Sequence, residues 1–286
     1  MMDLLSSAAT QAIAHVAARS SGQAIDATFR ISVHFHPDRL YRGKQLLDVL
    51  ANEGVFRAQF ETGTSNGGLT AYPGGDRWNW ESRIFGGAYD SVEAGERPKY
   101  GALNFRRRLC GGSVRFGSSH FRLTADALQR ATFCYPDSFF EPRDFGVAAR
   151  MRLIELAQAH PGDALDDYIE AQVHGPLRLG QDVEALVLDP CFRNTDVEAG
   201  ARRLSCPIEW HLGFEAQTSD ILANAKYRDE ESALLCVALA RDGKLDAAMI
   251  GQASRTGNFD EQGLKRAWHY VARFGSRESW PLNSAS

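Results

Sequence analysis

Residues 27–39 read ATFRISVHFHPDR, and this stretch decides how the chain starts to fold. Its first nine residues alternate in part and are rich in β-branched and aromatic side chains, which predicts a strand over Ala27–Phe35. Pro37 has no amide hydrogen to donate to a neighbouring strand, so the strand must stop before it. Because side chains alternate along a strand, His34 and His36 point to the same side of the chain.

The sequence around this strand predicts further elements. An apolar stripe predicts a helix over residues 3–19, and Leu46, Leu47 and Leu50 predict a short helix over Lys44–Asn52 that ends near Gly54. Tyr168–Val173 is typical of a strand with Glu170 and Gln172 on one face. We also expect a helix over Val147–His160, a helix or strand over Asp182–Leu188, a strand over Cys206–Phe214, and helices over 229–241 and 261–274.

The length and order of these elements bound the architecture. A chain of 286 residues forms one large domain or two modest ones. Strands and helices are mixed through the first two thirds, whereas helices dominate the end. We therefore predict a catalytic core of strands and helices over residues 1–215 and a helical extension over residues 216–286 that packs on it.

The overall charge argues against one class of partner. The formal net charge is −4 and the pI is about 6.1, so a protein that follows a nucleic-acid backbone, which needs a basic face, is not expected. The triplet Arg106-Arg107-Arg108 is typical of a solvated turn, although it could contact a polyanion.

The cysteines and the N-terminus indicate the compartment. The chain has five cysteines, an odd number, and no CxxC pair, which indicates free thiols rather than a disulfide framework or a zinc ribbon. No basic region precedes the first apolar residues, and no apolar run reaches the roughly 18 residues that span a bilayer. We expect a cytoplasmic protein, or one exported without a cleavable signal, and no membrane partner.

Glycine is concentrated in one part of the chain. Thirteen of the 26 glycines lie between Gly54 and Gly117, among aromatic and charged residues. Glycine weakens helices and strands, but it allows positive φ and close approach of the backbone to a ligand. We interpret the stretch as ligand-binding loops, with tight turns of a twisted sheet as the alternative.

Three groups in and after this stretch could contact a ligand. FETGTSNGG at residues 60–68 lacks the spacing of a nucleotide P-loop, but Thr62, Ser65 and Asn66 could hold a phosphate or a ribose. Tyr100 lies beside Gly101, where a base or nicotinamide ring could stack. Ser118 and Ser119 follow an aromatic-glycine pair, and turn serines are the alternative for them.

Two groups could carry chemistry. His34 and His36 could be two ligands of a metal, but His120, His174 and His211 lack supporting spacing. The alternatives are a polar binding face and two partly exposed histidines at the end of a strand. Glu170 would be costly to bury on a strand unless it were partnered or used. A surface position is its alternative.

The order of these groups resembles that of ADP-ribosyltransferases. Those enzymes present a His or Arg on an early strand, then a helix and a glycine-rich aromatic segment, then a Ser or Tyr position, and a catalytic Glu on a late strand. Here the same order runs through His34 or His36 with Arg39, FETGTSNGG, Tyr100, Ser118-Ser119 and Glu170. The whole chain also resembles an uncharacterised bacterial family of unknown function with runs such as FETGTSNGG and RPKYGALNF.

The resemblance implies a fold, a reaction and a site. The fold would be α+β, with a split, mostly antiparallel sheet and flanking helices. The chain would be an NAD-dependent ADP-ribosyltransferase with NAD as substrate and no metal. The acceptor and a role as a bacterial toxin or effector are left open. Glu170 and His36 would be catalytic, and the NAD-binding residues would be His34, Arg39, Arg57, Gln59, Thr62, Ser65, Asn66, Tyr100, Ser118 and Ser119.

Two other classes of function remain open. A metal-dependent hydrolase would use the pair His34 and His36 and would lose activity with a chelator. A non-catalytic protein that binds a nucleotide or a partner would release no nicotinamide from NAD. The enzymatic interpretations need Glu170 and the histidines near position 36 to face one crevice.

Overall fold

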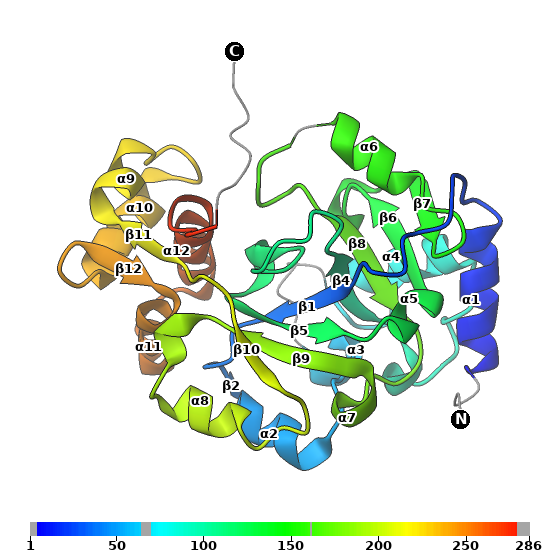
Figure 1. Ribbon diagram of the computed structural model, residues 1–286, viewed down its shortest axis with the longest axis horizontal. Coiled ribbons are helices and arrows are strands. Elements are labelled where there is room, and N and C mark those ends of the chain that lie inside the picture. The colour runs from blue at the N-terminus through cyan, green and yellow to red at the C-terminus, as the bar shows by residue number, and fades with distance from the viewer. Residues whose placement is uncertain (1–4, 64–69, 161, 279–286) are drawn as a thin grey trace.

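A single open sheet of eight strands runs through the computed structural model, which describes residues 5–63, 70–160 and 162–278 (Figure 1). The strand order is β10-β9-β5-β1-β4-β8-β6-β7, and every neighbouring pair is antiparallel except β9 with β10. The strands are β1 (Ile31–Phe35), β4 (Lys99–Leu103), β5 (Ser119–Leu123), β6 (Ala131–Tyr135), β7 (Asp144–Val147), β8 (Ile169–Val173), β9 (Val183–Leu188) and β10 (Ile208–Trp210).

The sheet divides between its two central strands. β1 pairs with β4 only at Ile31 and Ser32, and from there to Phe35 it pairs with β5 alone. On the other side, β4 before Ala102 pairs with β8 alone, back to Lys99. The two strands therefore diverge, and the predicted α+β class with a split, mostly antiparallel sheet and flanking helices is confirmed.

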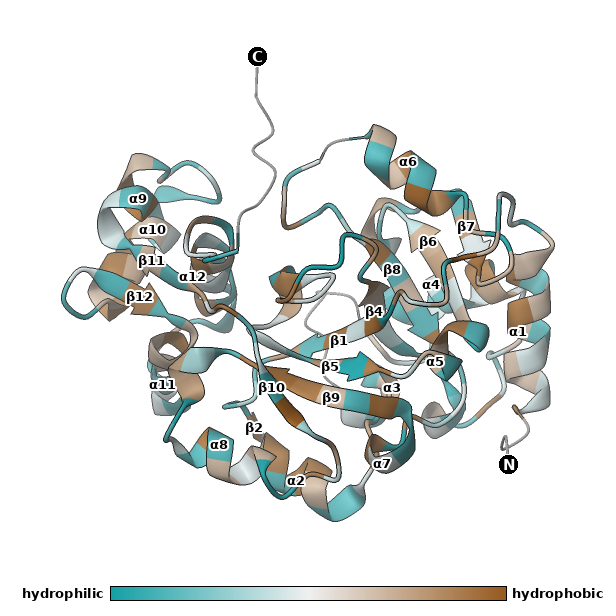
Figure 2. Ribbon diagram, viewed as in Figure 1, coloured by the Kyte–Doolittle hydropathy of each residue, from teal (hydrophilic) through white to brown (hydrophobic). Residues whose placement is uncertain are grey.

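One face of the sheet carries the largest hydrophobic core. Side chains alternate along each strand, so Val33, Phe121, Phe133 and Ile169 all lie on this face, and all are buried. Most of β9 is hydrophobic in Figure 2. The helices that bury residues against this core are α2 (Leu46–Glu53), α5 (Asp126–Gln129), α6 (Leu153–Ala159), α7 (Leu179–Asp182) and α8 (Asp196–Ala201).

The opposite face is polar near the division and apolar toward β7. Helices α1 (Ser7–Ala17) and α4 (Asp76–Phe85) pack over β6 and β7 and bury Trp80, Ile84 and Phe85. Glu170 lies on the same face, because it pairs with Ala102 on one side and Cys134 on the other. α4 therefore covers the strand that carries Glu170.

A third core lies in the C-terminal part of the chain, at the opposite end of the sheet from α1 (Figure 1). Trp268 and Tyr270 are buried there, and the Trp268 indole donates to the carbonyl of Val114 at 2.9 Å. A two-stranded antiparallel sheet of β11 (Glu215–Gln217) and β12 (Lys244–Asp246) lies in this part of the chain, together with the helices α9 (Thr218–Ala223), α10 (Glu230–Leu239), α11 (Ala247–Thr256) and α12 (Glu261–Phe274). The predicted boundary at residue 215 stays a prediction.

The remaining elements are short. They are β2 (Leu40–Tyr41), β3 (Lys44–Gln45), α3 (Gln59–Thr62) and four 3-10 turns, η1 (Ala94–Glu96), η2 (Val114–Phe116), η3 (Ser138–Phe140) and η4 (Pro190–Phe192). Within the described ranges, no helix combines the length and the hydropathy needed to cross a membrane.

Several predicted elements need correction. The predicted helix over Val147–His160 is wrong in its first part, because Val147 ends β7 and α6 starts at Leu153. The interpretation of residues 54–117 as loops is wrong for α4 and for β4. Gly75 and Gly86 flank α4 as its caps, and the apolar residues between them form a helical stripe. The helix over 261–274 is confirmed at both ends.

Asp38 joins the end of β1 to α11. Its carboxylate is buried, lies 3.3 Å from the Arg255 guanidinium, and has one oxygen, Oδ1, without a hydrogen-bond partner. A Cβ added at Gly251 would lie 1.5 Å from the other oxygen, so only glycine allows α11 to approach this closely. Burial raises the pKa of Asp38 to about 6, against the opposing effect of Arg255.

We expect the stability of this contact to depend on pH. A carboxyl whose pKa is higher in the folded chain stabilises it fully below the unfolded pKa, near 4, and this contribution is lost as the pH rises through 6. The loss is about 3 kcal/mol at about 1.4 kcal/mol per pKa unit. Urea unfolding at pH 4 to 7.5 should show a steeper loss of stability with pH in the wild type than in Asp38→Asn, by about this amount; equal slopes would contradict the assignment.

Candidate functional site

A pocket of about 240 Å³ lies where β1 and β4 diverge. Its walls include Val33–His36 from β1 and the turn after it, Lys99–Gly101 from β4, and Glu170 from β8. α4 adds Arg77. The pocket at the sheet division therefore brings Glu170 and the two histidines together.

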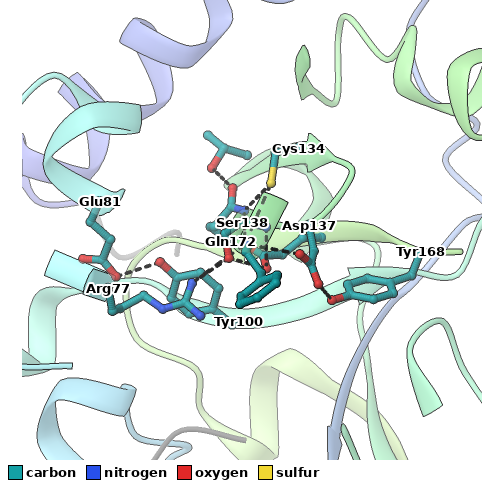
Figure 3. Close-up of polar contacts among 11 residues, drawn as sticks. Arg77, Glu81, Tyr100, Cys134, Asp137, Ser138, Tyr168 and Gln172 are labelled. Carbon is teal, nitrogen blue, oxygen red and sulfur yellow. Dashed lines mark hydrogen bonds and ion pairs between the residues drawn. The ribbon is translucent and has the colours of Figure 1, made fainter. Parts of the chain in front are cut away.

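The carboxylate of Glu170 is held by hydrogen bonds on both oxygens, from Ser138 and Gln172, which Figure 3 labels. Oε2 accepts from the Ser138 hydroxyl at 2.8 Å and from the Ser138 amide at 3.3 Å. Oε1 accepts from the Gln172 side-chain amide at 3.0 Å and lies 4.0 Å from Nη1 of Arg77. These contacts fix the orientation of the carboxylate, as a group that acts on a bound ligand requires.

The environment of Glu170 also sets its charge. Burial raises the pKa of Glu170 above its usual range, the nearby Arg77 guanidinium opposes this shift, and the Asp137 carboxylate adds to it. A carboxyl with a raised pKa in a pocket is a typical functional candidate, because structural carboxylates are more often held ionised by ion pairs.

A second network positions the Tyr100 ring beside this carboxylate (Figure 3). The Tyr100 hydroxyl donates to Oε1 of Glu81 at 2.8 Å, and Oε2 of Glu81 pairs with Arg97 at 2.6 Å. The Arg77 guanidinium lies 4.1 Å from the centroid of the Tyr100 ring. Since this cation covers one face of the ring, only the opposite face could stack on a ligand.

Asp137 forms the far side of the network. Its Oδ2 accepts from the Tyr168 hydroxyl, its Oδ1 from the amide of Phe139 at 3.0 Å, and the Tyr168 ring packs edge-on against Phe116. Asp137 and Ser138 thus come from the turn η3, directly after β6.

Sequence reasoning missed Arg77, Glu81, Asp137 and Ser138. Two signals were present. Arg77 and Glu81 are four residues apart among aromatic residues, a spacing that places both on one face of a helix. Pro136-Asp137-Ser138 has the composition of a turn directly after an apolar strand, where side chains often reach a site.

His34 has both ring nitrogens engaged. Nδ1 donates to the carbonyl of Gly117 at 3.1 Å, and Nε2 accepts from the amide of Ser113 at 3.3 Å. The ring stacks on His120 with centroids 4.9 Å apart, and burial lowers the pKa of His34 to about 3. A metal could bind His34 only by displacing one of these hydrogen bonds.

Other potential metal ligands do not gather around the histidine pair. In residues 5–63, 70–160 and 162–278, no group of three or more His, Cys, Asp or Glu side chains is arranged to hold a metal ion. The His36 ring packs edge-on against Trp268 with centroids 5.1 Å apart.

His36 and Arg39 lie at the border of the pocket. Both also line a second pocket of about 130 Å³ on the side of α12. Burial, together with the charge of Arg39, lowers the pKa of His36 to about 3, so its ring is neutral at physiological pH. A neutral imidazole can donate from one nitrogen and accept at the other.

Only some of the other predicted ligand contacts line the pocket. Arg57, Gln59 and Thr62 line the pocket, and Oε1 of Gln59 is buried there without a hydrogen-bond partner. Ser118 and Ser119 are buried and do not line it; the Ser119 hydroxyl accepts from the amide of Asp189 instead. The predicted contacts Ser65 and Asn66 lie outside the described residues.

A comparison with protein-family models identifies the family of this chain. The model of a family described as protein of unknown function (DUF3626) matches residues 30–157 and 145–272. Both pockets lie entirely within this range. No curated protein matches the chain.

Proposed function

This chain belongs to the DUF3626 family of proteins of unknown function, and from its pocket we propose that it is an NAD-dependent ADP-ribosyltransferase. One observation carries the proposal. A buried, fixed carboxylate on β8 and a neutral histidine after β1 line one pocket where the sheet divides. This is the arrangement that the resemblance in motif order implied.

The reaction would exchange two bonds at C1′ of the nicotinamide ribose. The bond between C1′ and the nicotinamide nitrogen breaks, and its electron pair leaves with neutral nicotinamide. A nucleophile of the acceptor forms the new bond to C1′ and loses its proton. Positive charge develops on the ribose ring in between, so a positioned carboxylate lowers the barrier.

Glu170 is the residue suited to that role. A carboxylate can accept about four hydrogen bonds, and Glu170 accepts two from Ser138, one from Gln172 and a long one of 3.8 Å from the Cys134 thiol, which a ligand would replace. That position can accept from a ribose hydroxyl. The ionised form is the active one, and its raised pKa makes the rate increase with pH.

The surrounding residues would orient NAD. The free face of Tyr100 would stack on nicotinamide, and His36 and Arg39 would contact the ribose and the adjoining phosphate, with Arg57, Gln59 and Thr62 along the wall. The acceptor is left open, as is a role as a bacterial toxin or effector.

The two other functions have less support. A metal-dependent hydrolase would need His34, whose ring nitrogens already bind Gly117 and Ser113. A non-catalytic protein that binds a nucleotide could use the same pocket, but it would not need a buried carboxyl with a raised pKa.

Incubation of the purified protein with NAD and a bacterial lysate tests the proposal. Free nicotinamide should appear, and mass spectrometry should find an ADP-ribose mass added to an acceptor. A chelator should leave the yield unchanged. Activity that depends on metal would favour the hydrolase, and NAD that binds without release of nicotinamide would favour the binding protein.

A further inference from the structure

The second pocket lies between the core and α12. Its walls are His36, Arg39, Arg115 and Phe116 from the core, and Glu261, Gln262, Lys265 and Trp268 from α12. It shares His36, Arg39 and Phe116 with the pocket of Glu170, so the two pockets adjoin. A ligand that fills the first can extend into the second.

Cations outnumber acids in this pocket. Arg39, Arg115 and Lys265 line it, and Glu261 is the acidic residue among its walls. Arg115 pairs with Asp166, and Arg39 lies 3.7 Å from Glu261. Lys265 has no hydrogen bond or ion pair within the described part of the chain. Burial and the nearby charge of Arg115 lower the pKa of Lys265.

Buried polar atoms near Lys265 also lack partners among the residues that the structure describes. His269 lies one helical turn after Lys265 and is 4% exposed, and neither of its ring nitrogens has a hydrogen-bond partner. Nε of Arg228 lacks a partner as well. Burial lowers the pKa of His269 to about 2, and Arg228, Arg115 and Lys265 act in the same direction. Lys265 does line the pocket, and an anion bound there would accept from its ammonium group.

We propose that this pocket binds phosphate, and specifically the diphosphate of the dinucleotide whose ribose reaches Glu170. The identity of the ligand rests on the function proposed above; the binding of an anion does not. The small volume fits a phosphate group rather than a polymer, and the adjoining pocket of about 240 Å³ is itself smaller than the roughly 300–1,000 Å³ typical of a whole ligand. α12 would thereby form part of the substrate site.

Calorimetric titration with inorganic pyrophosphate tests the anion site in the full chain. Wild type should bind pyrophosphate, and Lys265→Met should weaken binding by about tenfold or more, because a charge-assisted contact is lost. Lys265→Arg should retain most of the affinity. Lys226→Met removes the same charge from an exposed position in the same region and should change nothing. Equal affinity in wild type and Lys265→Met would overturn the proposal.

Kinetics with NAD separate this inference from the proposed function. If both hold, Lys265→Met raises the KM for NAD at least fivefold and changes kcat little, because the diphosphate is remote from the reacting bond. Pyrophosphate binding that depends on Lys265, without any cleavage of NAD, would retain the anion site and refute the transferase. Cleavage of NAD with an unchanged KM in Lys265→Met would retain the transferase and refute the role of this pocket in binding the diphosphate.

Discussion

Glu170→Gln is expected to lower the release of nicotinamide from NAD by about 10²–10³-fold or more. Loss of one oriented group that stabilises developing charge costs a few kcal/mol of barrier, and each 1.4 kcal/mol is about tenfold in rate. The amide that replaces the carboxylate keeps the shape of the side chain but cannot offset the positive charge on the ribose. The measurement is nicotinamide released per molecule of enzyme at saturating NAD.

The variant should fold. An amide oxygen can still accept from Ser138, while its NH2 group would face the NH2 of Gln172. Rotation of the Gln172 amide removes this conflict, because its oxygen accepts from the Thr132 hydroxyl, which can turn to accept instead. We expect the Tm of the variant at neutral pH to stay within a few degrees of the wild-type Tm. Burial disfavours the ionised form of Glu170, so a neutral amide at this position removes an unfavourable charge.

The pH profile provides a second readout. The wild-type rate should rise with pH as Glu170 ionises, and the residual rate of the variant should lack that rise. Glu141→Gln is the matched control, because this substitution removes the same charge from an exposed residue that pairs with Arg83 at the surface. Turnover in Glu170→Gln equal to that of this control would remove Glu170 from the mechanism.

The local pattern of the sequence was sufficient for several elements. The strand with Glu170 and the helix over 261–274 are confirmed, because a period of two or of 3.6 residues in the sequence indicates a strand or a helix directly. α4 was hidden because the glycines around it, Gly74-Gly75 and Gly86-Gly87, resemble those of a loop. In the structure they flank the helix at both ends.

The site was predicted less completely than the strands. Glu170 and His36 could be chosen from the residue types and their order, and they share a pocket. Their partners could not, because Ser138 lies 32 residues before Glu170 and is brought to it only by the pairing of β6 with β8. The same holds for Ser119. The pairing of β5 with β9 places its hydroxyl where it accepts a hydrogen bond from the amide of Asp189, which the sequence does not reveal.

Arg97→Met is expected to cause the largest loss of stability, about 3–5 kcal/mol. Arg97 and Glu81 are both buried, with Nη1 and Oε2 2.6 Å apart, and Arg97 also donates to the carbonyl of Tyr89. Removal of the guanidinium leaves the carboxylate of Glu81 buried with the Tyr100 hydroxyl as its remaining hydrogen bond. An uncompensated buried charge costs more than the pair contributes. Urea unfolding at pH 7.5 measures the loss.

The deficit should shrink in acid and in a double variant. Burial already raises the pKa of Glu81, and Arg97 opposes this, so the variant raises it further and its Glu81 takes up a proton as the pH falls. Glu81→Gln in the Arg97→Met background removes the charge at every pH and should recover at least half of the loss. A deficit below about 1 kcal/mol, or one unchanged by either treatment, would mean that water or movement of α4 compensates the carboxylate. Tyr100 would then owe its position to packing against Arg77 and not to this ion pair.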